Sequence, residues 1–327
     1  MILSLVLFLI GLLVLAKSSS ILVDGSSSIA KNFNISPVVI GLTVVAFATS
    51  APELTVSLSA ALSGSTDIAL GNVIGSNIFN ILVVLGLSAL VYPIHIHKNI
   101  VWREIPFSLI AALIVFIFAL FVVIKSPVAL DLNSVLVIGY LSRFSGIVLL
   151  GFFIAFLIYV IKTAKRSDPE KAIIKPIPLS KSIIYVALGM LGLVLASKYL
   201  VVNSAISLAS SFGFSQTLIG LTLVAIGTSL PELAASVTAA YKKNSDIAVG
   251  NVVGSNIFNL FLILGSTLLV TPIAITGQNI FDIIFLLFTT VILFILVFVL
   301  AKYKLNKVEG MILLALYIIY NIYIFIR

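Results

Sequence analysis

Residues 36–80 read SPVVIGLTVVAFATSAPELTVSLSAALSGSTDIALGNVIGSNIFN, and residues 215–259 read SQTLIGLTLVAIGTSLPELAASVTAAYKKNSDIAVGNVVGSNIFN. The two segments align without a gap, and 27 of their 45 positions are identical. Similarity of this degree at a fixed spacing indicates an internal duplication. The chain therefore consists of two related halves, and each half is expected to fold in the same way.

The composition is that of an integral membrane protein. Of the 327 residues, 61% are hydrophobic and only 9% are charged, and the mean hydropathy is +1.30. An ordinary soluble domain has about a quarter of its residues charged. Apolar runs of roughly 20 residues recur, long enough to cross a bilayer as helices, whereas the alternating segments of a membrane β-barrel are not seen. We predict an all-α polytopic membrane protein.

Hydropathy and the duplication together predict ten transmembrane helices, five in each half. An odd number of helices per half makes the second half enter the membrane from the opposite side, which gives two inverted-topology five-helix repeats. The first hydrophobic stretch, 2–29, is the repeat partner of the stretch 183–211, so we expect it to be a retained helix and not a cleaved signal peptide. The predicted helices are 2–29, 36–63, 67–92, 102–124, 135–162, 183–211, 215–241, 246–271, 278–301 and 308–326.

The basic residues predict the orientation in the membrane. Fourteen lysines and arginines fall in one set of alternate loops, and only Lys125 and Arg327 fall in the other set. Cytoplasmic loops carry the excess of Lys and Arg. We therefore expect a cell-membrane protein with both termini extracellular. The first repeat is predicted over 1–162, a cytoplasmic linker over 163–182, and the second repeat over 183–327.

Composition also limits the partners. The chain has no cysteine, which excludes disulfides and thiolate metal sites. The net charge of +8 resides on loops and not on a soluble domain, so no nucleic-acid partner is expected. We expect a lipid bilayer around the protein, no cofactor, no enzymatic activity and a functional monomer.

Two glutamates occupy the middle of predicted helices, Glu53 and Glu232, and they align in the duplication. Burying one carboxylate near mid-membrane costs about 2.5–3.5 kcal/mol on insertion scales. Two such groups repel each other unless positive charge lies between them, and neither helix has a central lysine or arginine. A metal cation, or protonation, must supply the missing charge.

A proline precedes each glutamate, Pro52 and Pro231. Proline removes a backbone donor, so we predict that each helix opens about one turn earlier, over Ala46–Ser50 and Ala225–Ser229. Opened turns free carbonyl oxygens, such as those of Ala46 and Ala225. Hydroxyls are added by Thr49, Ser50, Thr228 and Ser229. Carboxylate, hydroxyl and carbonyl oxygens are hard ligands that suit Ca²⁺ or Na⁺ better than zinc or copper.

The next helix of each half adds polar side chains on one face. Ser76 and Asn80 are four residues apart, as are Ser255 and Asn259, so each pair shares a helix face. Asn77 and Asn256 point elsewhere and are expected to bind the opened backbone. Small-xxx-small spacing predicts close helix contacts at Gly71, Gly75, Gly250 and Gly254.

The duplicated TSxPE and GNxxGSNIFN segments resemble the two α-repeats of the cation/calcium antiporter superfamily, in particular its prokaryotic sodium/calcium exchanger branch. The resemblance implies ten helices with four ion sites between the second, third, seventh and eighth. By position, it makes Glu53 and Glu232 the central Ca²⁺ ligands. It assigns the remaining Ca²⁺ and Na⁺ contacts to Thr49, Ser50, Thr228, Ser229 and the carbonyls of Ala46 and Ala225. Ser76 and Ser255 would serve outer Na⁺ sites, and Asn80 and Asn259 lie nearest a middle site.

Two positions depart from the pattern of the family. Asn259 stands where potassium-dependent members have aspartate, which argues against K⁺ co-transport. Ala48 stands where glycine is usual, whereas Gly227 keeps the usual residue, so the two opened turns are expected to differ.

The resulting expectation is a secondary antiporter that exchanges Na⁺ for Ca²⁺ and normally extrudes Ca²⁺. The alternative is a Ca²⁺/H⁺ antiporter of the same fold, although the proton-coupled branch tends to have GNxxE where this chain has TSxPE. A channel is disfavoured by the inverted repeats. An intramembrane aspartyl protease is disfavoured because the central acids are glutamates.

Overall fold

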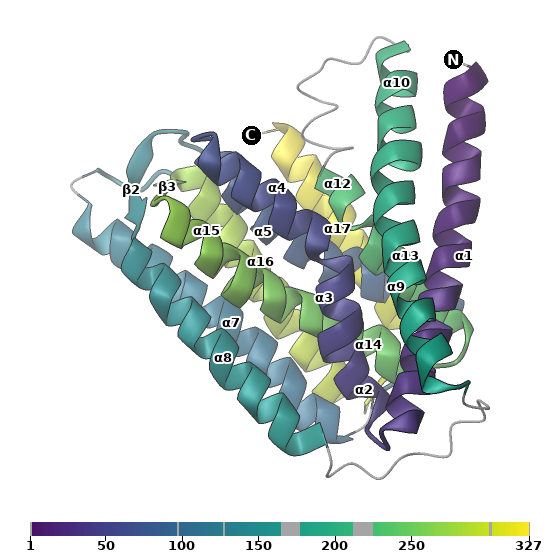
Figure 1. The fold of residues 1–327 in the computed structure, drawn as a ribbon. Coiled ribbons are helices and arrows are strands. Elements are labelled where there is room, and N and C mark those ends of the chain that lie inside the picture. Colours follow the sequence, from purple (N-terminus) through teal and green to yellow (C-terminus); the bar gives the residue numbers. More distant parts are fainter. Residues whose placement is uncertain are drawn as a thin grey trace.

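A computed structural model describes residues 2–96, 98–126, 128–164, 177–211, 225–300 and 303–326. These residues form a bundle of long helices with four short strands (Figure 1). Within the described ranges, eight helices are long and apolar enough to cross a membrane, or nine if the bent pair Pro37–Thr49 and Ala51–Leu62 counts as one span. The prediction of a helical membrane protein is confirmed.

The first half contains five helical units, several of which are interrupted by short π-helical turns (η). Their bounds are α1 (Ile2–Asn32); α2 (Pro37–Ile40), η1 (Gly41–Val45), α3 (Ala46–Thr49) and α4 (Ala51–Leu62); α5 (Thr66–Phe79), η2 (Asn80–Val84) and α6 (Leu85–Val91); α7 (Lys98–Lys125); and α8 (Arg143–Ala164).

The second half repeats this order among its described residues. Residues 212–224, the first part of the predicted 215–241 helix, and residues 165–176, most of the predicted linker, lie outside the described ranges. The helical bounds are α9 (Leu179–Leu195), η3 (Ala196–Val202) and α10 (Asn203–Ser211); α12 (Ala225–Thr228) and α13 (Leu230–Tyr241); α14 (Ser245–Ile257), η5 (Phe258–Ile263) and α15 (Leu264–Val270); α16 (Gly277–Ile295) and η6 (Leu296–Leu300); and α17 (Lys307–Ile326).

One predicted helix is too long. The helix expected over 135–162 begins only at Arg143, and Val137–Leu141 is a strand, β2, paired antiparallel with β3 (Ile273–Thr276). A short apolar run rich in β-branched residues fits a strand as well as a helix. The choice is made by the pairing partner from the other half of the chain, which hydropathy does not reveal.

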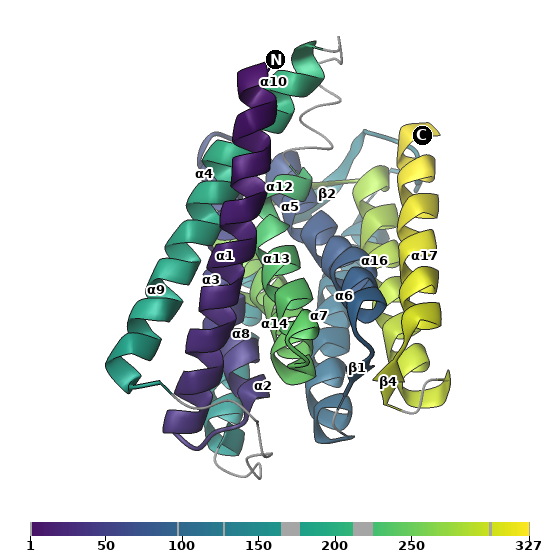
Figure 2. The same ribbon diagram turned by 90° about the vertical axis from the view of Figure 1, so that its right-hand side faces the viewer.

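A second small sheet pairs β1 (Ile94–His95) with β4 (Lys304–Leu305). Strands β1 and β3 both follow the third helical unit of their half, and β2 and β4 both precede the fifth. Each sheet therefore pairs the strand after the third helical unit of one half with the strand before the fifth helical unit of the other half. The two sheets differ only in which half supplies which strand. Figure 2 shows β2 toward the upper end of the bundle and the β1–β4 pair toward the lower end.

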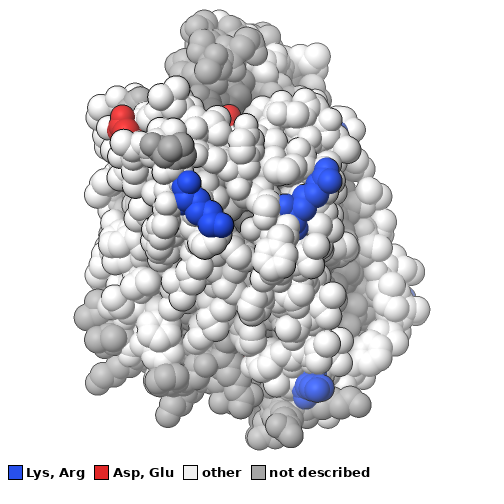
Figure 3. Space-filling view, turned by 90° about the vertical axis from the view of Figure 1, so that its left-hand side faces the viewer, with Lys and Arg blue, Asp and Glu red and all other residues white. Residues whose placement is uncertain are grey.

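The two central helices are α5–α6 and α14–α15. Their most apolar windows are 83% and 94% buried inside the protein, whereas the corresponding value is 44% or less for the other spans. Helices α1, α9 and α10 stand together at one side, and α7 and α8 lie at the other (Figure 1). Most described residues on the face to which α7 and α8 belong are uncharged, with a few Lys, Arg, Asp and Glu side chains among them (Figure 3), as expected for a surface largely in contact with lipid.

Helix α14 packs closely on the η1–α3 segment, as the spacing of Gly250 and Gly254 predicted, whereas an added Cβ at Gly71 or Gly75 meets no described atom within 4 Å. A Cβ added to Gly250 would lie 3.1 Å from the Cα of Gly41, and one added to Gly254 would lie 2.7 Å from the Cβ of Ala46. The repeat-equivalent partners of Gly71 and Gly75 fall at about 217–225, mostly outside the described residues.

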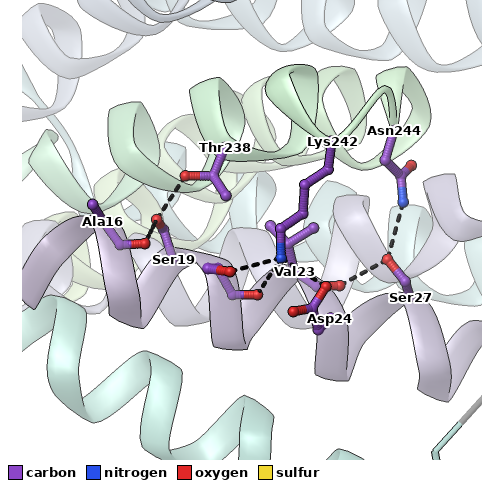
Figure 4. Close-up of polar contacts among 9 residues, drawn as sticks. Ala16, Ser19, Val23, Asp24, Ser27, Thr238, Lys242 and Asn244 are labelled. Atoms are coloured by element: carbon purple, nitrogen blue, oxygen red, sulfur yellow. Dashed lines mark hydrogen bonds and ion pairs between the residues drawn. The ribbon is translucent and has the colours of Figure 1, made fainter. Parts of the chain in front are cut away.

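Helix α1 meets α13 through polar side chains (Figure 4). Lys242 Nζ donates to Asp24 Oδ1 and Ser20 Oγ, each at 2.7 Å, and to the Ser20 carbonyl at 3.0 Å. Four residues before Lys242, Thr238 Oγ1 of α13 lies 2.7 Å from Ser19 Oγ of α1. These contacts hold the first helix of one half to the helix of the other half that carries Glu232.

Candidate cation site

Both helices that carry a central glutamate are interrupted, as the prolines predicted. Helix α3 ends at Thr49 and α4 begins at Ala51, with Ser50 between them at φ −82° and ψ 5°. The axis bends there by 46°. Ser229 has nearly the same conformation, φ −89° and ψ 6°, between α12 and α13.

The interruption is narrower than predicted. Ala46–Thr49 remains helical, and the Ser50 N–H still donates to the Ala46 carbonyl at 3.0 Å, so the expected opening of the whole Ala46–Ser50 turn is wrong. Pro52 lies in the first turn of α4, where a missing N–H costs little because that donor has no partner in the helix. The break is therefore confined to the residue that precedes the new helix.

The two carboxylates are held by serines of opposite halves. Glu53 and Glu232 are each 0% exposed. Ser229 Oγ donates to Glu53 Oε1 at 3.0 Å, and Ser50 Oγ donates to Glu232 Oε1 at 2.9 Å. The break of each half thus faces the glutamate of the other half, and the duplicated segments form one continuous polar site.

The predicted serines of the following helices also lie in this site. Ser76 Oγ is 3.1 Å from Ser229 Oγ. Ser255 Oγ donates to Glu232 Oε1 at 3.4 Å and lies 3.4 Å from Thr49 Oγ1. All of these side chains are buried. The structure therefore brings Ser255 to the Glu232 carboxylate and Ser76 to Ser229, the serine that donates to Glu53.

The two threonines bond to asparagines that sequence reasoning did not select. Thr49 Oγ1 donates to Asn251 Oδ1 at 3.1 Å, and Thr228 Oγ1 donates to Asn72 Oδ1 at 3.2 Å. Both asparagines are buried and both follow a glycine in the GNxxGSN motif. Their identity in the two copies is the signal that could have pointed to them.

Asn80 and Asn259 lie deeper in the same helices, within the π-helical turns η2 and η5. Asn80 Nδ2 donates to Asn256 Oδ1 at 3.1 Å, and Asn77 Nδ2 donates to the Val73 carbonyl of its own helix at 2.7 Å. The expectation that Asn77 and Asn256 bind the opened backbone is therefore wrong. A π-helical turn inside an α-helix is frequent at functional sites.

Several buried polar atoms have no hydrogen-bond partner among the described residues. They include the second carboxylate oxygen, Oε2, of both Glu53 and Glu232, as well as Asn80 Oδ1 and both amide atoms of Asn259. An unpartnered buried oxygen is costly, and a charged one more so. A cation at these oxygens removes that cost.

The chemistry of the donor set indicates which cation fits. Within the described ranges, no group of three or more His, Cys, Asp and Glu side chains is arranged to hold a metal ion. Two carboxylates surrounded by hydroxyl and amide oxygens are hard ligands of the kind that Ca²⁺ and Na⁺ take. The Ala46 carbonyl lies beside this set, 3.4 Å from Thr49 Oγ1, and Ala225 is the first residue of α12.

The two breaks have nearly the same backbone angles at Ser50 and Ser229, and they carry different residues at Ala48 and Gly227. The carbonyl of Gly227 accepts Ser197 Oγ at 2.7 Å, and a Cβ at this position would collide with the side chain of Val202. Ala48 is buried and carries its methyl group. Packing of the π-helical η3 segment on α12 therefore leaves no room for a side chain at Gly227.

Comparison with known proteins decides the family. The profile of the family described as Sodium/calcium exchanger protein matches residues 3–162 and 181–326. The chain belongs to the sodium/calcium exchanger family. The match covers both halves, and it leaves out the segment that the sequence predicts to be the linker.

Relatives in this family match over most of their length. The chain is 32% identical to Sodium/calcium exchanger MaX1 of Methanosarcina acetivorans, covering 98% of this chain and 97% of that protein. It is 36% identical to Inner membrane protein YrbG of Escherichia coli (strain K12), covering 83% and 81%. Among solved structures, the sodium-calcium exchanger NCX_Mj soaked with 10 mM Na⁺ and zero Ca²⁺ superposes with a TM-score of 0.77, at 34% identity over 97% of each chain.

Proposed function

We propose that this member of the sodium/calcium exchanger family is a secondary antiporter that exchanges Na⁺ for Ca²⁺ across the membrane by alternating access. The observation that carries the proposal is the crossed pair of buried glutamates, Glu53 and Glu232, each with one oxygen that has no partner among the described residues. The names of MaX1 and NCX_Mj describe exchange of the same two ions.

In this proposal Glu53 and Glu232 are the central Ca²⁺ ligands. The hydroxyls of Thr49, Ser50, Thr228 and Ser229, with the carbonyls of Ala46 and Ala225, complete the Ca²⁺ site and the flanking Na⁺ sites. Ser76 and Ser255 contribute to outer Na⁺ sites, and Asn80 and Asn259 to a middle position. The hydrogen bonds that join these side chains across the two halves support a shared site.

The mechanism follows from charge and desolvation. Two ionised carboxylates carry a charge of −2, which one Ca²⁺ neutralises and which Na⁺ ions neutralise in its place. A charged site is costly to carry through a low-dielectric interior, whereas a neutralised site is not. Occupation by either ion therefore permits the conformational change, and the absence of both opposes it, so transport of one ion is coupled to return of the other.

We further propose ten transmembrane helices in two inverted repeats, 1–162 and 183–327, joined by a cytoplasmic linker. The equivalence of the two small sheets with the halves exchanged supports inversion. Helix α1 begins and α17 ends toward the same side of the bundle (Figures 1 and 2), which supports an even number of spans. The excess of basic loop residues supports extracellular termini. A site built within one chain supports a functional monomer, and an inward Na⁺ gradient would drive normal Ca²⁺ extrusion from the cytoplasm.

The alternative coupling ion is the proton, which would replace Na⁺ by protonating the two glutamates. The number of hydroxyl and amide oxygens around the carboxylates favours Na⁺, because protonation needs only the carboxylates whereas Na⁺ needs further oxygen ligands.

The two couplings are separated with the purified wild-type protein in proteoliposomes. Na⁺-loaded vesicles diluted into Na⁺-free buffer with ⁴⁵Ca²⁺ should accumulate the isotope. Vesicles with an equal pH gradient and no Na⁺ should not accumulate it. Uptake driven by the pH gradient alone would replace the sodium proposal by the proton one.

A further inference from the structure

Asn72 and Asn251 occupy equivalent positions and make equivalent bonds, although neither belongs to the set of ion ligands proposed above. Asn72 Nδ2 donates to the carbonyl of Glu53 at 3.2 Å and to Ser57 Oγ at 2.9 Å. Asn251 Nδ2 donates to the carbonyl of Glu232 at 3.4 Å and to Ser236 Oγ at 2.9 Å. Each asparagine is therefore hydrogen-bonded to the backbone of the central glutamate in its own half.

These bonds fix which way each amide points. A backbone carbonyl only accepts hydrogen bonds, so the atom of Asn72 that faces the Glu53 carbonyl must be the NH₂ group. The oxygen, Oδ1, then faces Thr228 of the opposite half, 3.2 Å away. The same argument turns Asn251 Oδ1 toward Thr49, at 3.1 Å.

The fixed amide oxygens determine the orientation of the threonine hydroxyls. A hydroxyl has one proton and two lone pairs, and an amide oxygen can only accept. A threonine hydroxyl beside Oδ1 therefore lowers its energy by donating its proton there, and its lone pairs then face the remaining directions. For Thr49 the Ala46 carbonyl is a second acceptor, but it is farther away, at 3.4 Å against 3.1 Å for Asn251 Oδ1. Those directions include the carboxylate cluster, because Thr49 Oγ1 also lies 3.4 Å from Ser255 Oγ, which donates to Glu232.

We propose that Asn72 and Asn251 are positioning residues: each holds the proton of a threonine hydroxyl from the opposite half, so that Thr228 and Thr49 present lone pairs, and not a proton, to the transported cation. The proposal rests on the sodium/calcium exchange proposed above. It adds that the two halves are coupled at the site by these bonds. A cation ligand from one half is aligned by an amide of the other half, which also holds the glutamate backbone.

The proposal predicts that the asparagine acts through the threonine, which a double-mutant cycle measures. Thr49→Val removes the hydroxyl with little change of shape, and Asn251→Leu removes the amide that orients it. Each single variant is expected to weaken the apparent Ca²⁺ affinity about tenfold, as loss of an oriented polar ligand in a buried charged site does. The double variant should lose clearly less than the roughly hundredfold product of the two single losses, because without the hydroxyl there is no proton to orient. Any loss beyond that of Thr49→Val reflects the bond from Asn251 to the Glu232 carbonyl.

The measurement is the Ca²⁺ concentration that half-saturates Na⁺-driven ⁴⁵Ca²⁺ uptake in proteoliposomes, together with the rise in the thermal midpoint of the purified protein on adding Ca²⁺ alone. Asn321→Leu is the matched control: its amide donates to the Tyr317 carbonyl four residues earlier in α17, away from the site, at 2.8 Å. It should leave the half-saturating concentration unchanged. Thr49→Ser, which keeps a hydroxyl, should retain most of the affinity.

The outcomes separate this inference from the proposed function. If wild type shows Na⁺-driven uptake and the two single losses multiply to about a hundredfold in the double variant, the asparagine acts independently of the threonine and the inference is overturned. An Asn251→Leu variant with wild-type affinity overturns it as well. If Asn251→Leu fails to fold, the equivalent pair Thr228→Val and Asn72→Leu gives the same test. If wild type itself shows no Na⁺-driven uptake, the proposed function fails first.

Discussion

A methyl group added at Gly254 should disturb the cation site without replacing any proposed ligand. Gly254 lies on α14 next to Ser255. A Cβ at this position would lie 2.7 Å from both the Cβ of Ala46 and the carbonyl oxygen of Leu42, and 2.8 Å from the Leu42 Cα. Two of these three atoms belong to the backbone, so no side-chain rotation relieves the overlap.

The displacement can be worked out from these distances. Non-bonded carbon atoms prefer about 3.5–4.0 Å, so α14 and the η1–α3 segment must separate by about 1 Å. The bonds that join them at the site, from Thr49 Oγ1 to Asn251 Oδ1 at 3.1 Å and to Ser255 Oγ at 3.4 Å, would then exceed hydrogen-bond length. Overpacking costs about 1–3 kcal/mol, and each 1.4 kcal/mol expressed in binding is about tenfold in affinity. We expect Gly254→Ala to weaken the apparent Ca²⁺ affinity at least about fivefold.

The assay is the Ca²⁺ dependence of Na⁺-driven ⁴⁵Ca²⁺ uptake, with the folded state of each variant checked by size-exclusion chromatography and circular dichroism. Gly151→Ala on α8 is the control, since Gly151 is exposed and an added Cβ meets no described atom within 4 Å. It should behave as wild type. A folded Gly254→Ala protein with wild-type Ca²⁺ dependence would refute the close contact between α14 and α3 as a determinant of site geometry.

Two further predictions concern orientation and the α1–α13 interface. Because the chain has no cysteine, single cysteines report sidedness cleanly. Positions 129 and 243 are both exposed and lie on opposite sides of the membrane in the proposed topology. In intact cells, Ala129→Cys should react with a membrane-impermeant maleimide and Lys243→Cys should not. The reverse pattern would invert the proposed topology. The side chains of the Lys242–Asp24 ion pair are 26% and 47% exposed. A double-mutant cycle with Lys242→Met and Asp24→Asn, followed by thermal unfolding, should therefore give a coupling energy of about 1 kcal/mol or less. A coupling energy of several kcal/mol would contradict this.

The sequence predicted the parts of the site that depend on a single copy of the repeat. A buried carboxylate after a proline is visible in Glu53 alone, and so is the helix break, because a proline removes a backbone donor wherever it stands. Duplication then indicated that Glu232 has the same role. Ser76 and Ser255 followed from helical periodicity.

The contacts between the halves could not be predicted in the same way. Periodicity says which residues share a face, but not which face of the other half they meet. Asn72 and Asn251 were missed for this reason, and Asn256 was assigned to the backbone although it meets Asn80. Strand β2 was read as helix because its pairing partner, β3, comes from the other half.

The extent of the helix break also depends on more than sequence. Proline in the interior of a helix opens a whole turn, whereas proline in the first turn of a new helix leaves the preceding turn intact. In this chain α4 begins immediately after Ser50, so Pro52 lies in the first turn of a new helix and the preceding turn stays intact. Sequence alone does not distinguish these cases, because the position at which the second helix begins is set by packing.

The proposed exchange depends most on the two carboxylates binding one Ca²⁺ together. Glu53→Gln and Glu232→Gln each keep the shape of the side chain and an oxygen that can accept from Ser229 or Ser50, but each removes one negative charge. Glu309→Gln is the control, a charge removed at the start of α17, where its carboxylate accepts the Asn306 N–H at 2.8 Å.

Na⁺-driven ⁴⁵Ca²⁺ uptake into proteoliposomes, measured for these three variants beside wild type, tests the claim most directly. We predict that Glu309→Gln exchanges as wild type does and that both site variants lose uptake, since one remaining charge neither neutralises Ca²⁺ nor completes its ligands. Uptake at the wild-type rate in either Glu53→Gln or Glu232→Gln would contradict a shared site.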